Sequence, residues 1–411
     1  MSRALGYSPL LPPVMNRATC GVLVVLASAA AARDVSFAEA RTLSLHAAAD
    51  VQLAERRHDV SLAEVDVVGA LVNPTISLST ATQTARLGSF LSVPVPLFGQ
   101  RSGALDAARA DAAAVRLDVD VTRREARWAA TVAWLDLWEA QERAQLLERG
   151  AEDAARVMDI ASQRLDAGTG PRLDVLRTRV DQVRARAEAQ AAQALSTAAA
   201  ARLAPWLGVA PELALTAAGP PGYSTDPLQQ LEGKQADVHP VLRRDLAQVE
   251  ASGLHLVQEQ RLRWPVLTPQ VGVSAFDPTL PRPDVVVGLS FEVPVLSLRG
   301  GAIARAQAQR SLAEATADAD ARRLSALLID ALARSRSSAL RRRALHEDVR
   351  PAMEEARAMT QDAYLAGRVD LLRLLEAQRA LLEAQLAEVE ATAAWGRALA
   401  DVERAAGVDL Q

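Results

Sequence analysis

The side chains with the most chemical potential in this 411-residue chain are five histidines and one cysteine. Imidazole and thiolate groups bind transition metals when several of them converge, which short motifs of fixed spacing usually achieve. The histidines stand at positions 46, 58, 239, 255 and 346, without any such spacing. No HExxH motif, phosphate-binding glycine loop or nucleophile motif occurs. The sequence therefore predicts a protein that is not an enzyme and has no metal site and no cofactor.

The charge composition argues against nucleic-acid binding. The formal net charge is −4, and Lys234 is the only lysine. The basic run Arg341-Arg342-Arg343 is better explained as the solvated face of a helix. Aromatic residues make up only 3% of the chain, which suits long helices packed through alanine and leucine rather than one compact core.

The first 32 residues have the pattern of a secretory signal peptide. Arg17 supplies a positive flank, and the apolar run that starts at Gly21 is too short to span a bilayer. Cys20 precedes this run, so it is not placed for lipidation. Either Met1 or Met15 can serve as the start. After cleavage no cysteine remains, as expected for a protein of the oxidising periplasm.

The chain contains a long-range internal repeat. The segment 92–110, SVPVPLFGQRSGALDAARA, aligns without a gap with 290–308, SFEVPVLSLRGGAIARAQA, a shift of 198 residues. In both copies an alternating apolar segment ends at a proline and leads into an alanine-rich helix. A repeat of this length indicates a duplicated half-protein rather than a solenoid unit.

Hydrophobic periodicity extends this pattern to the whole chain. Each half is expected to contain a helix, a β-hairpin and a long antiparallel α-hairpin with a glycine turn. The predicted first repeat is 33–207, with helix 35–71, strands 75–81 and 89–96, and helices 101–167 and 172–207. After a connector at 208–239, the second repeat is 240–411, with helix 240–263, strands 270–276 and 285–293, and helices 301–366 and 370–406. Helix 301–366 is expected to break only near Pro351.

The strands alternate apolar and polar residues, with no charge on the apolar faces. Two hairpins cannot close a sheet alone, but four strands from each of three chains would make twelve, enough for a barrel. Phe90, Phe98, Phe276 and Phe291 lie in or beside the strands, as expected for anchoring at a membrane interface. A soluble sheet packed on a helix layer is the alternative. The strands of the first hairpin are short compared with the roughly 9–11 residues of a membrane strand.

Taken in order, these motifs resemble the TolC family of outer-membrane efflux channels, including its heavy-metal efflux branch. The resemblance rests on Asn73-Pro74, the exit 96–103, His239-Pro240, and two similar helix tips, RLDAG with LDVL at 164–176 and YLAG with VDLL at 364–372. It implies a mainly α fold in a homotrimer, with a twelve-stranded outer-membrane barrel, a periplasmic helical tunnel and contact with outer-membrane lipid. It also implies two partners, a periplasmic adaptor and an inner-membrane efflux transporter of the RND type.

The resemblance assigns roles to residues at the two tips. Tyr364, Arg368 and Asp370 would hold or ring a closed aperture, together with Asp174 at the first tip. The family's next acidic position is Arg373 here, which weakens the case for a cation-selective aperture. Docking of the adaptor would involve Arg164, Leu165, Gly168, Leu365 and Gly367. Simpler roles remain open: Asp370 as a helix N-cap, Tyr364 as a packed aromatic, and Arg164 and Leu165 as an ordinary helix end.

Two other functions fit parts of the pattern. A periplasmic adaptor also has long α-hairpins, but it has one of them rather than two halves with a β-hairpin each. A structural coiled-coil protein of the cell envelope would not need charge-free strand faces. The cargo of an efflux duct, whether metal ions or organic drugs, does not follow from the sequence.

Overall fold

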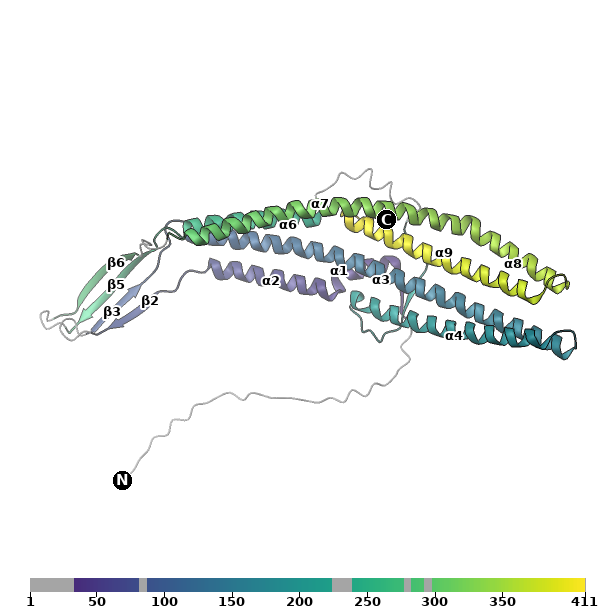
Figure 1. Ribbon diagram of the computed structural model, residues 1–411. Helices are drawn as coiled ribbons and strands as arrows, with labels where there is room; N and C mark the ends of the chain where they lie inside the picture. Colours follow the sequence, from purple (N-terminus) through teal and green to yellow (C-terminus); the bar gives the residue numbers. More distant parts are fainter. Residues whose placement is uncertain (1–32, 81–86, 224–238, 277–281, 292–297, 411) are drawn as a thin grey trace, which may run out of the picture. The chain divides into compact units, whose positions relative to one another are not determined.

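A computed structural model describes residues 33–80, 87–223, 239–276, 282–291 and 298–410 (Figure 1). The predicted signal peptide, residues 1–32, lies outside the described residues. So do the last two residues of the strand expected at 285–293.

Two long antiparallel α-hairpins dominate the described chain. The first joins α3 (Gln100–Asp166), with 67 residues, to α4 (Arg172–Leu203). At 1.5 Å per residue, α3 is about 100 Å long. The second joins α7 (Gly300–Ala344), the π-helical turn η2 (Leu345–Val349) and α8 (Arg350–Leu365) to α9 (Leu371–Ala406). Figure 1 shows the two hairpins side by side, as the contacts between α3 and α9 require.

The expected break near Pro351 takes the form of a π-helical turn. Pro351 is the second residue of α8, and its ring removes a backbone N–H that could donate to a carbonyl of the preceding turn. The wider turn η2 directly before it lets the helical path continue into α8.

The prediction of one unbroken helix over 35–71 is wrong. The segment contains β1 (Arg33–Ser36), α1 (Phe37–Ala47) and α2 (Ala49–Gly69), with Ala48 in an extended conformation between the helices. Ala48 is fully buried. We interpret the break as a tertiary effect, because Gly208 packs directly on the end of α1. Gly208 follows the short helix η1 (Ala204–Leu207), and a Cβ atom on residue 208 would lie only 2.8 Å from the Ala47 carbonyl oxygen.

The predicted connector 208–239 contains a strand that periodicity did not indicate. Residues 215–218 form β4 (Leu215–Ala218), which pairs in parallel with β1. Four residues are too few for a strand pattern to be recognised. Pairing between segments nearly two hundred residues apart depends on the core that brings them together.

The four remaining strands form one antiparallel sheet in the order β2-β3-β5-β6. These are β2 (Thr75–Ser79), β3 (Leu87–Ser92), β5 (Leu267–Ala275) and β6 (Asp284–Phe291). The two hairpins join through β3 and β5, where the ring of Phe90 lies over Gly272. Among the described strands, β2 and β6 each have one unpaired edge. With five and six residues, β2 and β3 are short for membrane strands.

The main core surrounds the middle of α3. Trp134 and Leu135 are fully buried there, and the Trp134 indole Nε1 donates to the Val35 carbonyl at 2.8 Å. Phe37 from α1 contacts the edges of both Trp134 and Tyr223, and Trp395 from α9 joins the same cluster. The core therefore ties the start of the described chain to both long hairpins.

Helix α6 (Pro240–Arg261) packs between α3 and α7 and leads into β5. Its N-cap is His239, whose Nδ1 accepts from the Val241 amide at 3.2 Å. The Nε2 atom lies 3.0 Å from the Arg404 carbonyl, so the proton of the neutral ring belongs on Nε2. Within the described residues, no helix has both the length and the apolar character needed to cross a bilayer.

A buried ion pair crosses this core. The Arg41 guanidinium lies 2.6 Å from Glu403, and the two side chains are 9% and 11% exposed. The Leu410 amide donates to the same carboxylate, and Tyr223 lies 3.4 Å from its second oxygen. Burial raises the pKa of Glu403 above its usual range, although Arg41 and the Leu410 amide act in the opposite direction.

We expect Arg41→Ala to destabilise the protein by about 3 kcal/mol at pH 8, because it leaves a buried carboxylate unpaired. Removing Arg41 also raises the pKa of Glu403 further. An acid whose folded-state pKa exceeds its unfolded value loses its contribution to stability as the pH rises. The thermal midpoint of Arg41→Ala should therefore fall more steeply than that of the parent from pH 5 to pH 8. Arg56→Ala, which removes an exposed pair with Asp59, is the control. Equal slopes would contradict this account of the pair.

Candidate functional site: the tips of the two helical hairpins

The two hairpins turn at glycines in the left-handed region. Gly168 has φ 72° and Gly367 has φ 68°, which residues with a Cβ rarely adopt. The Gly367 amide donates to the Tyr364 carbonyl at 3.0 Å, and the Arg368 amide donates to the Ala363 carbonyl at 2.8 Å. These bonds satisfy the last carbonyls of α8 and reverse the chain within a few residues. The first tip turns through the longer segment 167–171.

The tips are linked through Arg164 and Tyr364. The Arg164 guanidinium donates to the Tyr364 hydroxyl at 2.8 Å, and its central carbon lies 5.3 Å from the centre of the ring. Arg164 is on the last turn of α3 and Tyr364 is on the last turn of α8. One side chain from each hairpin therefore forms a direct polar contact between them.

The Tyr364 ring itself is packed. It is only 6% exposed and lies in a small apolar cluster with Val157 of α3 and Leu371, Leu374 and Leu375 of α9. Tyr364 is thus both a packed aromatic and a hydrogen-bonded link between the hairpins. The simpler role expected from the sequence, a packed aromatic, therefore applies to Tyr364.

Asp370 is the N-cap of α9. Its Oδ1 accepts from the Arg373 amide at 3.1 Å, and its own backbone is extended. The side chain is otherwise exposed, as are Arg368 and Arg373. The capping role leaves the second carboxylate oxygen available to solvent.

The first tip places Asp174 in the opening turn of α4, half-buried, with its amide bonded to the Pro171 carbonyl. The structure gives Asp174 no side-chain link to the second tip within the described residues. Of the residues expected to meet a docking partner, Arg164, Gly168 and Gly367 are exposed and Leu165 is half-buried. Leu365 is the last residue of α8, and its side chain lies outside the described part of the structure.

A second link between the hairpins was not predicted. The Arg379 guanidinium of α9 bonds to the Asp181 carboxylate of α4, in a pair 198 residues apart. No pattern in the sequence pairs these two positions, because their contact depends on how the two hairpins lie against each other. Near this pair, a groove lies between the hairpins and is lined by arginines 149, 184, 357 and 379 together with the acidic residues Asp153, Asp181 and Glu188.

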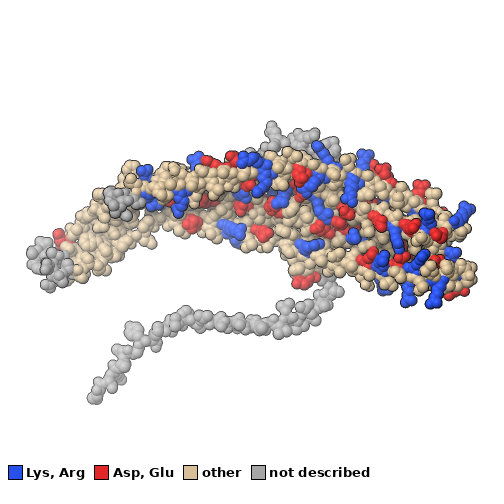
Figure 2. All heavy atoms as spheres, viewed as in Figure 1, with Lys and Arg blue, Asp and Glu red and all other residues tan. Residues whose placement is uncertain are grey.

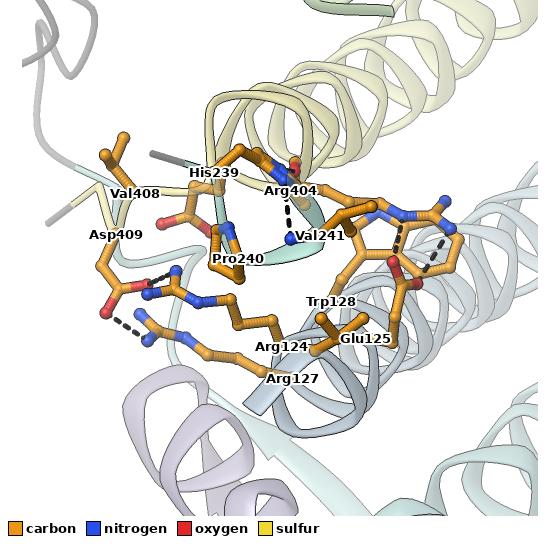
Figure 3. Close-up of a pocket in the computed structure, with 13 residues that line it drawn as sticks. Arg124, Glu125, Arg127, Trp128, His239, Pro240, Val241, Arg404, Val408 and Asp409 are labelled. Atoms are coloured by element: carbon orange, nitrogen blue, oxygen red, sulfur yellow. Dashed lines mark hydrogen bonds and ion pairs between the residues drawn. The ribbon is translucent and has the colours of Figure 1, made fainter. Parts of the chain in front are cut away.

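A small pocket lies farther from the tips, where α3, the start of α6 and the end of α9 meet (Figure 3). Arg404 bonds to Glu125 at 2.9 Å and covers the Trp128 ring at 4.1 Å. Asp409 pairs with Arg127 at 2.7 Å and lies 3.7 Å from Arg124. Because these charges neutralise one another, we interpret the pocket as a joint between elements rather than a ligand site.

The described residues contain no group of three or more histidine, cysteine or acidic side chains arranged to hold a metal ion. His255 contacts Asp111 at 2.7 Å, and His346 contacts Glu388 at 2.6 Å. Each histidine therefore faces one carboxylate rather than a set of ligands.

Comparison with known proteins identifies the family. The model of the family described as outer membrane efflux protein matches residues 40–209 and 256–408, more than half of the chain. The chain belongs to the outer membrane efflux protein family. Both long hairpins and the tip residues fall within the matched segments, so the efflux protein is an outer-membrane channel with a long periplasmic helical part.

Several relatives agree with this placement. The efflux protein is 26% identical over 353 residues to the cobalt-zinc-cadmium resistance protein CzcC of Cupriavidus metallidurans, covering 84% of each chain. Its fold is similar to the outer membrane channel CmeC of Campylobacter jejuni, with a TM-score of 0.75, 14% identity and coverage of 90% and 85% of the two chains. The outer-membrane channel OprN gives a TM-score of 0.72 at 20% identity, covering 91% and 90%.

The cap at Asp370 gives a local test of the second tip. Asp370→Ala should destabilise the start of α9 by about 1 kcal/mol, because the Arg373 amide loses its acceptor. Amide hydrogen exchange over the first turn of α9 should become several-fold faster. Asp370→Asn, which can still cap, should exchange at nearly the parental rate. Equal exchange in the alanine variant and the parent would show that the cap does not stabilise the turn.

Proposed function

We propose that the efflux protein works as a homotrimer whose twelve strands close a barrel in the outer membrane. The observation that carries this proposal is the four-stranded sheet with unpaired outer edges at β2 and β6. An open sheet edge cannot persist in hydrocarbon, where unsatisfied backbone groups are costly. Pairing β2 of one chain with β6 of the next satisfies both edges. Three chains with four strands each then give twelve strands.

The long helices support the same assembly. Four apolar residues on α4 remain 51–64% exposed and alternate in steps of three and four: Leu173, Leu176, Val180 and Val183. Such a stripe is the seam of a coiled coil that lacks its partner helix. On α7, Leu312 and Ile329 are 68% and 70% exposed. We infer that the α4 edge of one chain packs on the neighbouring chain's α7–α8 edge to complete a helical tunnel.

The internal repeat explains how one chain supplies two similar sectors. We infer that the halves 33–207 and 240–411 arose by duplication, so that a threefold assembly approximates a sixfold tunnel.

For gating, we propose that the link between Arg164 and Tyr364 holds the tips in a closed arrangement. The link is one hydrogen bond with a cation–π contact, and Arg164 is exposed, so its net contribution is on the order of 1 kcal/mol. A docking partner could therefore break it. Arg368, Asp370, Arg373 and Asp174 lie around the same tips and would set the charge of the aperture.

The partners that fit this duct are a periplasmic adaptor and an inner-membrane transporter of the RND type. The adaptor would meet the tips at Arg164, Leu165, Gly168, Leu365 and Gly367. As cargo we propose divalent metal ions, because the relative CzcC is a cobalt-zinc-cadmium resistance protein by name. Arg373 stands where an acidic ring would favour cations, so we assign the choice of cargo to the transporter rather than to the aperture.

Assembly can be tested on the α4 stripe. Val180→Glu places a charge in the proposed seam, so trimer that persists on unheated gels of the outer-membrane fraction should fall several-fold. Gln193→Glu adds the same charge at an exposed position of α4 outside the stripe and should leave the trimer intact. A monomer in both the parent and the control would refute the trimeric duct.

Gating can be tested in planar lipid bilayers. Replacing Tyr364 with Phe and Asp370 with Ala removes the hydroxyl link and the tip carboxylate, so single-channel conductance should rise several-fold. The control is the combination of Tyr364→Phe with Asp370→Asn, which keeps the cap. If only the Ala combination opens the channel, helix capping rather than the Arg164 link controls the tips. An unchanged conductance in both would show that this assignment of the aperture is wrong.

A further inference from the structure

The place where the sheet meets the helices carries an exposed aromatic pair. The rings of Phe98 and Trp264 stack with their centres 5.5 Å apart and an angle of 26° between their planes. Phe98 is 49% exposed and Trp264 is 59% exposed. Gln100 fixes their positions: its side chain donates to the Trp264 and Pro265 carbonyls and accepts from the Phe98 amide. A preorganised aromatic pair that remains half exposed suggests an external partner.

Arginines flank this pair without matching acids. Arg101 follows Gln100 and donates to the Gly69 carbonyl, and Arg263 precedes Trp264. Both are exposed, and neither has a carboxylate partner among the described residues. The nearby acids are already paired, Glu259 with Arg299 at 2.6 Å and Asp106 with Arg261 at 3.9 Å. The junction therefore presents uncompensated positive charge beside exposed aromatic rings.

Beyond the junction the surface changes abruptly. Strands β2, β3 and β5 contain no charged residue, and Asp284 of β6 lies at the far end of the sheet. Ile76, Leu78 and Val287 on these strands are about 70% exposed or more, at 68%, 71% and 78%. Figure 2 shows the same boundary, with the sheet almost uniformly tan and the blue and red residues beginning at the helices.

We propose that Arg101, Arg263, Phe98 and Trp264 form a binding site for the headgroup of an anionic phospholipid in the periplasm-facing leaflet. A guanidinium group matches phosphate oxygens in a bidentate geometry, and amphipathic aromatic rings favour the headgroup level of a membrane. The charge-free sheet on one side and the charged helices on the other put this site at the edge of the hydrocarbon. The inference rests on the proposed barrel.

The first test uses the purified trimer in detergent with either phosphatidylglycerol or phosphatidylcholine, and counts retained lipids by native mass spectrometry. One arginine near an anionic lipid is worth roughly a fivefold change in affinity. Arg263→Gln should therefore lower retention of phosphatidylglycerol about fivefold, whereas Arg263→Lys, which keeps the charge but not the bidentate geometry, should give a value between that of Arg263→Gln and the parent. Arg186→Gln, which removes an exposed arginine on α4 far along the chain from this junction, should have no effect. Unchanged retention in Arg263→Gln would overturn the proposal.

A second measurement separates this site from insertion itself. In vesicles with a nitroxide on the lipid headgroup, Trp264 should be quenched, and Trp264→Phe should remove that component of the quenching. If the protein inserts and Trp264→Phe changes nothing, the headgroup site is refuted while the barrel stands. If the protein does not insert, the barrel fails and the headgroup site fails with it.

Discussion

The outer edges of β2 and β6 carry backbone groups that no other strand of the described chain pairs. In water such edges invite association, and in a bilayer they are excluded. The apolar residues on the strand faces and in the stripe on α4 are also exposed, so they too need a neighbouring surface to cover them. A single chain cannot bury these surfaces, which is the reason for proposing that several copies assemble. The long α3, the paired hairpins and the terminal sheet are consistent with such an assembly.

The core in the middle of the molecule holds the two hairpins in register. The core around Trp134 and the buried pair of Arg41 with Glu403 join the start and end of the described chain. Toward the tips the packing becomes sparse, with small clusters such as the one around Tyr364 and a few polar links. This gradient makes the tips the part of the molecule that a partner can rearrange at the lowest cost in free energy.

Periodicity predicted the long helices well because their packing faces repeat over many turns. The stepping of Leu371 and Leu374, for example, leads directly to their buried positions in α9. The break at Ala48 was missed because alanine fits both the helix pattern before it and the one after it. The conformation there depends on Gly208, which is distant in sequence. Strand β4 was not predicted for the same reason, because its pairing with β1 depends on the folded core.

At the tips, the family resemblance pointed to candidate residues but not to their partners. Asp370 could be assigned as a cap because the N-cap position follows from the turn at Gly367. The contact of Arg164 with Tyr364 could not be assigned, because it depends on the relative axial position of two helices joined only through distant segments. The link of Asp181 with Arg379 could not be assigned either, because it depends on how α4 and α9 lie against each other.

The central claim is that β2 of one chain pairs with β6 of the next. Cryo-electron microscopy of the purified protein in lipid nanodiscs tests it most directly. The account predicts threefold symmetry and a closed barrel of twelve strands, with backbone hydrogen bonds joining β2 and β6 of adjacent chains. A different number of chains, or a sheet that stays open at these two edges, would contradict it.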